Sequence, residues 1–160
     1  MDELLFIEDD GEAETTPPLR GADGWLVLLV DSDGDSHGTT RMALRHFEFH
    51  GRPLRFVSTF SEPETMHVLP ELVAPALILL EGVLADYDSG VRIVRTVRDD
   101  LENHRVQIIV RTSGADLAGK ARYAGLQING FVLKAEVDKR TLERLVANAL
   151  DAYCLAGPQC

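Results

Sequence analysis

Several polar residues follow directly after short apolar runs, in positions from which they could act together. Asp31 and Asp33 come after the first run, and Glu81 comes after the third. Thr112 and Lys134 follow the fourth and fifth runs. Carboxylates are ligands that Mg²⁺ prefers, and a lysine supplies a movable positive charge for an anion. If the runs end at one edge of a sheet, these residues predict a site for a divalent cation and a phosphoryl or carboxylate group.

The apolar runs predict strands that are covered on both faces, because they are continuous and do not alternate with polar residues. Segments with helical spacing separate them, so strand and helix alternate five times. This order favours an α/β fold with an open, doubly wound parallel sheet of five strands and five helices. In such sheets ligands collect beyond the carboxyl ends of the strands. The five runs are Trp25–Val30, Leu54–Val57, Pro75–Leu80, Val106–Val110 and Phe131–Leu133.

The helical segments have recognisable ends. We expect the first helix over about residues 38–49 and a weaker fourth helix over 115–123. Ser61 begins a capping box for the second helix, and Pro70 should kink or end that helix. Asp138 is a good cap for the last helix. The predicted helices therefore lie in the segments of sequence between and after the predicted strands.

Charge and composition limit the classes of protein. Acidic residues outnumber basic ones by 26 to 16, giving a net charge of −10, which argues against direct binding of nucleic acid. No apolar run is long enough to cross a membrane, and the start lacks the basic segment of a signal peptide. We therefore expect a cytoplasmic protein without a membrane contact. Cys154 and Cys160 lack the context of a metal site or a disulfide scaffold and are interpreted as reduced.

Three segments are expected along the chain. Residues 1–23 combine a run of carboxylates with prolines and glycines, a composition typical of a disordered acidic arm. Residues 24–154 carry all the predicted strands and helices and form one domain. Residues 155–160 are a short tail.

Each polar residue after a run also has an ordinary structural explanation. Asp31 and Asp33 are typical caps of a following helix, and Thr112 is a common turn residue. Glu81 alone would be a solvated loop carboxylate, and Lys134 alone would lie along the surface with its charge in water. Only their joint placement at strand ends favours a functional site.

A calcium loop is excluded. Asp31, Asp33 and Asp35 have the spacing of the first three ligands of such a loop. However, Ser36 stands where the loop needs glycine, and Met42 stands where it needs glutamate.

The order of the elements and these residues together resemble the receiver (CheY-like) domain of bacterial response regulators in two-component systems and phosphorelays. The resemblance covers about residues 25–153 and is carried by L-V-L-L-V-D at 26–31, A-L-I-L-L-E at 76–81, I-I-V-R-T-S at 108–113 and N-G-F-V-L-K at 129–134. It implies a flavodoxin-like sheet with strand order 2-1-3-4-5. It also implies Thr112, Phe131 and Lys134 as the equivalents of the conserved hydroxyl, aromatic and lysine.

The sequence departs from the usual receiver pattern at the centre of the site. Glu81 stands where receivers carry the aspartate that accepts the phosphoryl group, and it is one methylene longer. A 1 Å misplacement alone costs roughly 10²-fold in a positioned reaction. Ser32 replaces the second acid of the Mg²⁺ site, with Asp33 as a substitute, and Ala135 replaces the usual proline. We therefore expect a pseudo-receiver in which Asp31, Asp33 and Glu81 bind Mg²⁺ weakly, if at all.

Three functions follow from this pattern. The favoured one is a signalling module that is not an enzyme and acts by protein contact without phosphorylation. Its partner would be a histidine kinase, an output domain or a second copy in a homodimer, bound through the face of the fourth helix, fifth strand and fifth helix. The second is a phosphorylated receiver that uses another acid, Asp86 or Asp88. The third is a small metal-dependent phosphohydrolase.

Overall fold

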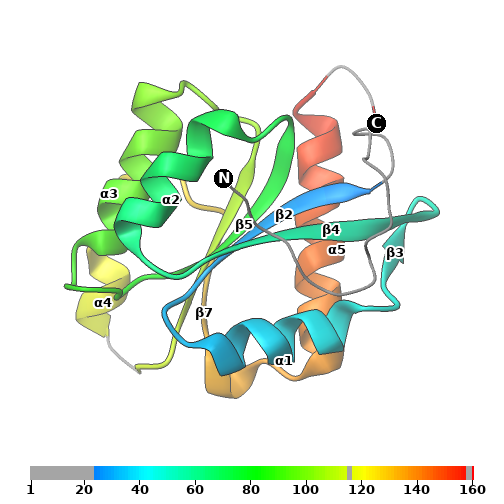
Figure 1. Ribbon diagram of the computed structural model, residues 1–160, viewed down its shortest axis with the longest axis horizontal. Coiled ribbons are helices and arrows are strands. Elements are labelled where there is room, and N and C mark those ends of the chain that lie inside the picture. Colours follow the sequence, from blue (N-terminus) through cyan, green and yellow to red (C-terminus); the bar gives the residue numbers. More distant parts are fainter. Residues whose placement is uncertain (1–23, 115–116, 158–159) are drawn as a thin grey trace.

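The computed structural model describes residues 24–114, 117–157 and 160. The predicted acidic arm, residues 1–23, lies outside the described residues. The described chain forms three layers, with one sheet between two groups of helices (Figure 1). The predicted α/β class is therefore confirmed.

Among the described residues, the sheet has six strands in the order β3-β4-β2-β5-β6-β7. Five of them are parallel, and their spatial order is the predicted 2-1-3-4-5. The prediction of five strands was one strand short, because a short antiparallel strand extends the sheet beyond β4. The strands are β2 (Trp25–Val30), β3 (Glu48–Phe49), β4 (Arg52–Thr59), β5 (Pro75–Glu81), β6 (Gln107–Thr112) and β7 (Gly130–Leu133).

The additional strand arises from a tight hairpin that the sequence analysis assigned to a helix. Glu48 pairs with Pro53, and Phe49 pairs with Arg52. The two residues between the strands, His50 and Gly51, have φ angles of 53° and 72°. Two consecutive positive φ angles are what a two-residue hairpin turn requires. The first helix therefore cannot continue to residue 49 as predicted.

In the part of the chain that the structure describes, five α-helices cover the two faces of the sheet (Figure 1). Three short turns of other helix types extend or follow them: Leu69–Glu71 and Lys134–Glu136 are 3₁₀ turns, and Thr96–Asp100 is a π turn after α3. None of the helices found in the described ranges is long and apolar enough to cross a membrane. The α-helices are α1 (Gly34–Leu44), α2 (Glu62–Val68), α3 (Ser89–Arg95), α4 (Leu117–Ala121) and α5 (Lys139–Leu155).

Local signals explain where these helices begin and end. The side chain of Asp33 accepts a hydrogen bond from the amide of Asp35, so α1 begins four residues before the predicted start at 38. Ser61 and Asp138 cap α2 and α5 in the same way, as predicted. Pro70 lies in the 3₁₀ turn that ends α2, again as predicted.

Alternate residues of each strand pack into two separate cores. Leu29, Leu79 and Ile109 point toward α1 and α5. The intervening residues, such as Val30 and Val110, pack with α3 and Tyr123 on the other face. The parity of a residue in its strand therefore decides which group of helices its side chain meets.

The two cysteines form a disulfide, so the prediction that they are reduced is wrong. Cys154 lies in the last turn of α5, and Cys160 lies six residues later. Their Cα atoms lie 5.4 Å apart, which is within the range that a disulfide can bridge. Two cysteines alone do not form the pattern of a disulfide scaffold, so the sequence pattern gave no sign of this bond.

Candidate functional site

Three charged residues at the carboxyl ends of neighbouring strands share one face of the sheet. Asp31 follows β2, Glu81 ends β5, and Arg111 lies near the end of β6, opposite Glu81 in the strand pairing. Each is two residues beyond a core residue that faces α1 and α5, so all three side chains lie on that side. All three are buried. We call these residues and Lys134 the charged rim.

Lys134 joins the two carboxylates of the rim. It follows β7, and its Nζ lies 2.5 Å from Oδ2 of Asp31 and 3.0 Å from Oε1 of Glu81. The carboxylate side chains are 6% and 7% exposed, and Lys134 is 22% exposed. Glu81 and Lys134, which come from two different strand ends, thus form a direct ion pair. The pair is shielded from water, so its charges interact more strongly than those of a surface ion pair.

The contacts of Lys134 change the acid–base properties of both partners. Burial alone would raise the pKa of Asp31, but hydrogen bonds from Lys134 and the amide of Asp33 lower it below its ordinary value. Burial alone would lower the pKa of Lys134, but its bonds to Asp31 and Glu81 raise it above its ordinary value. Asp31 and Lys134 are therefore both charged over the neutral pH range.

The carboxylate oxygens of the rim already have protein partners, which argues against a bound Mg²⁺. Oδ1 of Asp31 accepts from the amide of Asp33, and Oδ2 accepts from Lys134. Oε1 of Glu81 lies against Lys134, and Oε2 accepts from the amide of Val83. Within the described part of the chain, no group of three or more acidic, histidine or cysteine side chains could hold a metal. The residues present therefore do not fit Mg²⁺, which needs close oxygen ligands in octahedral order.

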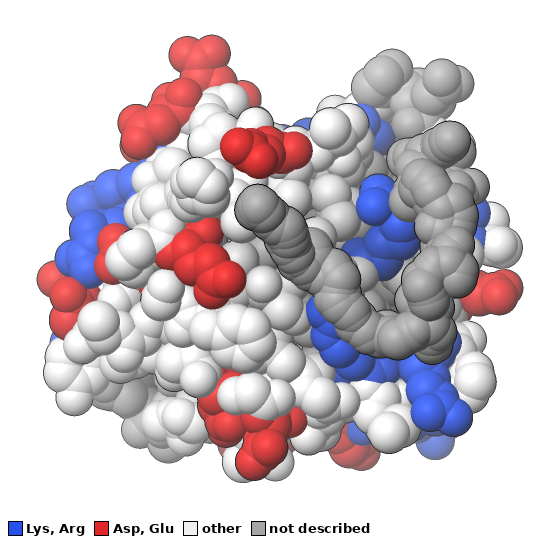
Figure 2. All heavy atoms as spheres, viewed as in Figure 1, with Lys and Arg blue, Asp and Glu red and all other residues white. Residues whose placement is uncertain are grey.

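The side chains of the two residues after Asp31 take no part in the contacts of the charged rim. Ser32 is exposed and has no carboxylate. Asp33 is also exposed, and its carboxylate caps α1. Figure 2 shows an acidic patch at the end of the molecule where α1 begins. Of the predicted metal ligands, the structure thus brings together Asp31 and Glu81, while Asp33 serves the helix.

Thr112 and Phe131 lie on the other side of the sheet edge. Both line a small cavity of about 20 Å³ together with Gly82, Tyr87 and Tyr123. The Thr112 hydroxyl accepts a hydrogen bond from the amide of Gly114 at 3.3 Å. The ring of Phe131 lies 5.9 Å from that of Tyr123, measured between centroids. The predicted hydroxyl and aromatic therefore form a group separate from the ion pair of Lys134.

Tyr123, which the sequence analysis did not single out, fills the space between the loop after β5 and the start of α3. A Cβ atom added at Gly90 would lie 2.0 Å from its hydroxyl, and one added at Gly82 would lie 2.8 Å from it. The side chain is 5% exposed, and its hydroxyl has no hydrogen-bond partner among the described residues. Burial raises the pKa of Tyr123 to about 12, so the hydroxyl is neutral. The two glycines make this close approach possible.

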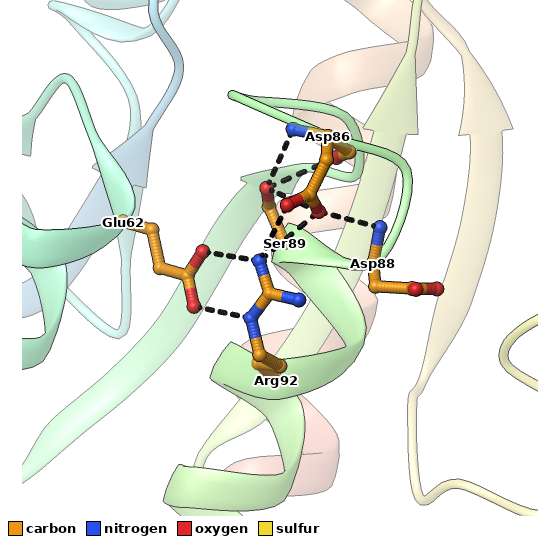
Figure 3. Close-up of polar contacts among 5 residues, drawn as sticks. All are labelled: Glu62, Asp86, Asp88, Ser89 and Arg92. Carbon is orange, nitrogen blue, oxygen red and sulfur yellow. Dashed lines mark hydrogen bonds and ion pairs between the residues drawn. The ribbon is translucent and has the colours of Figure 1, made fainter.

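The loop after Glu81 is held by a cluster of charges on α2 and α3 (Figure 3). Arg92 binds both carboxylate oxygens of Glu62 at 2.7 Å and those of Asp86 at 3.0 Å. Asp86 also accepts hydrogen bonds from the amide of Asp88 and the hydroxyl of Ser89. The arginine lowers the pKa of Asp86. Asp86, one of the two alternative phosphoryl acceptors, therefore already has several local partners.

A chain of hydrogen bonds supports the backbone at Asp31. Arg41 donates to the hydroxyl of Ser58, which lies 2.9 Å from Nδ1 of His37. Nε2 of His37 lies 2.8 Å from the carbonyl oxygen of Asp31, so it carries the proton in this bond. Burial lowers the pKa of His37, which keeps the ring neutral. His37, interpreted from sequence as an ordinary helix residue, thus holds the end of β2 in place.

Solved structures with the same architecture include the CheY-like response regulator receiver domain from Methanospirillum hungatei JF-1. The match has a TM-score of 0.69 at 18% identity and covers 84% of this chain and 99% of that one. This chain has the receiver fold. The signal receiver domain of an HD domain-containing protein from Pseudomonas fluorescens Pf-5 also matches, with a TM-score of 0.67 at 18% identity, over 81% of this receiver-like chain and 97% of that one. No family model matches the sequence.

A similar protein of known activity changes one prediction. The chain is 34% identical over 156 residues to the 3'3'-cGAMP-specific phosphodiesterase 2 of Vibrio cholerae serotype O1. The match covers 95% of this chain and 30% of that protein, so the receiver-like chain spans less than a third of its relative. We predicted a protein that is not an enzyme. That prediction is wrong as it stood, because this relative is an enzyme.

Proposed function

We propose that the chain is a receiver-like regulatory module that acts through protein contacts, without phosphorylation, in the service of a cyclic-dinucleotide phosphodiesterase. The observation that carries this proposal is the contact of Glu81 with Lys134 at 3.0 Å. Under the resemblance to receivers, Glu81 occupies the position of the phosphoryl acceptor. Its carboxylate therefore lies beside the lysine without any chemical modification of the chain.

The geometry of Glu81 supports a role without phosphoryl transfer. An acceptor needs a carboxylate oxygen free to attack phosphorus in line with the leaving group. Both oxygens of Glu81 are engaged within the chain. Oε1 forms an ion pair with Lys134, and Oε2 accepts a hydrogen bond from the amide of Val83. Freeing Oε1 would leave Lys134 less well compensated, and freeing Oε2 would break the hydrogen bond from the amide of Val83, so both changes oppose the reaction.

The surface that we propose for the partner is the face formed by α4, β7 and α5. β7 is the last strand of the sheet, and its residues Gly130–Leu133 are all half-buried. Edge strands offer backbone groups for contact with another chain. The partner would be a phosphodiesterase catalytic unit, a histidine kinase or a second copy. Under this proposal, residues 24–154 form the module, residues 1–23 are an arm, residues 155–160 are a tail, and the protein works in the cytoplasm.

Incubation with acetyl phosphate and Mg²⁺, followed by intact-mass measurement, tests the proposal. We expect the mass of the chain to stay unchanged, because Glu81 and Asp86 are both engaged by cationic side chains. A conventional receiver domain in the same tube provides the control for an active donor. A gain of one phosphoryl group would contradict the proposal. Mapping of the modified residue would then show whether Asp86 or Asp88 is the acceptor.

A second candidate function is hydrolysis by the chain itself, which the phosphodiesterase activity of the relative favours. The described residues contain no group of three metal-binding side chains, and their rim carboxylates are engaged. Incubation of the chain with 3'3'-cGAMP and Mg²⁺ or Mn²⁺, with the nucleotide followed by chromatography, tests this function directly. Turnover that is lost in an Asp31→Asn variant would establish the second function instead.

A further inference from the structure

The two carboxylates of the charged rim are near two cations of the chain itself. Lys134 contacts both acids directly. Arg111 lies opposite Glu81 in the pairing of β5 with β6. Its side chain lies on the same face of the sheet as those of Asp31 and Glu81, and the charges of these acids favour its protonated form. Two negative and two positive side chains therefore share this edge of the sheet, and their formal charges cancel.

Arg111 is an unusual residue for its position. It lies in a strand of otherwise apolar or uncharged residues, and it is only 9% exposed. Its Nη2 donates to the hydroxyl of Thr40 on α1 at 2.9 Å, which ties the guanidinium to the helix beside the rim. A buried charge without a counter-charge is strongly unfavourable, so the two nearby acids stabilise the guanidinium at this position.

We infer that Arg111 is a built-in counter-ion that supplies the positive charge for which this rim would otherwise need a divalent cation. The basis of the inference is that the residues of the charged rim do not fit a Mg²⁺ site. The carboxylate oxygens are engaged within the chain, and Ser32 adds no carboxylate. A divalent cation at the acids would also meet the repulsion of both Lys134 and Arg111.

This inference deepens the proposed function. It rests on that function in one respect, namely that the charged rim keeps a single fixed structure. Burial lowers the pKa of Arg111, but an arginine remains protonated at every pH at which the protein is folded. Arg111 is therefore a positioning residue whose charge is constant. It would make the conformation of the rim independent of the concentration of divalent cations.

Binding of Mn²⁺ to the full chain tests the inference, with the bound ion followed by electron paramagnetic resonance. We expect the parent to show only weak binding that does not saturate. In Arg111→Met, which keeps the apolar stem but removes the charge, we expect Mn²⁺ to bind at least about tenfold more tightly, because a nearby like charge has been removed. An added Asp31→Asn substitution should abolish the gain.

Two matched variants separate charge from other effects. Arg111→Lys keeps the positive charge and should bind Mn²⁺ as weakly as the parent. Arg95→Met removes an exposed arginine from α3 and should also match the parent. Equal Mn²⁺ affinity in folded Arg111→Met and in the parent would overturn the inference.

A measurement on the parent covers the case in which Arg111→Met does not fold. Ligand binding to the native state raises the midpoint of thermal unfolding, so we expect no change for the parent in up to about 10 mM Mg²⁺. A rise that disappears in Asp31→Asn would overturn the inference. The proposed function fails on a different result, a gain of mass from a phosphoryl donor, so the two failures are distinguishable.

Discussion

A Lys134→Met variant should have a free energy of unfolding about 3 kcal/mol lower than that of the parent at neutral pH, because removing one partner of a buried ion pair leaves the other charge uncompensated. Lys134 contacts both Asp31 and Glu81, and those side chains are 6% and 7% exposed. Methionine keeps most of the apolar stem, so the loss reports the charge. Chemical denaturation followed by tryptophan fluorescence measures the difference.

The control for this variant is Lys120→Met, which changes an exposed lysine on α4 and should shift the free energy by no more than about 0.5 kcal/mol. The pH dependence gives a second check. The pKa of Asp31 is lowered from 3.8, so its part of the stability is present above that value and is lost as the pH falls through the folded pKa. The pKa of Lys134 is raised from 10.5, so its part is present below that value and is lost as the pH rises through the folded pKa. A difference between parent and variant that is small, or equal at acid and neutral pH, would contradict the burial of this pair.

Gly90→Ala and Gly38→Ala should change stability in opposite directions. A Cβ atom at Gly90 would lie 2.0 Å from the hydroxyl of Tyr123 and 2.9 Å from the Cα of Gly82, so we expect a loss of about 3 kcal/mol from overpacking. A Cβ atom at Gly38, within α1, would meet nothing within 4 Å. Alanine is the better helix former there, so we expect a gain of about 0.5–1 kcal/mol. The midpoints of thermal unfolding measure both effects.

The effect at Gly90 should depend on the hydroxyl of Tyr123. In a Tyr123→Phe background the closest clash is absent, so Gly90→Ala should cost less than in the parent. A double-mutant cycle gives this coupling energy. Equal losses in the two backgrounds would show that Tyr123 does not fill the space between Gly82 and Gly90.

Continuous apolar runs were enough to predict the parallel part of the fold. Each run covers at least half of a strand, and the order of strands in the sheet follows from the resemblance. The errors lie where a local geometry overrides the pattern. Asp33 starts α1 early through a cap, and the positive φ angles at His50 and Gly51 replace the end of the predicted helix by a hairpin. The residues at those positions do not by themselves reveal the backbone angles.

The candidate site was predicted in part for a similar reason. Residues at strand ends converge because parallel strands share an edge, which brings Asp31, Glu81 and Lys134 together. Arg111 was missed because one charged residue in an apolar strand gives no sign of what lies opposite it. Its spacing is the signal that could have found it. Arg111 lies two residues after Ile109, a core residue that faces α1, so both side chains lie on the same face of the strand.

The pairing of Glu81 with Lys134 has a consequence for timing under the proposed function. A phosphoryl group is attached and later hydrolysed, so a protein that carries one keeps a record of a past event for a limited time. A glutamate is made with the chain and lasts as long as the chain does. A partner that recognises this edge would therefore meet the same surface at every moment, and the duration of a signal would depend on synthesis, degradation and the rate at which the two proteins separate.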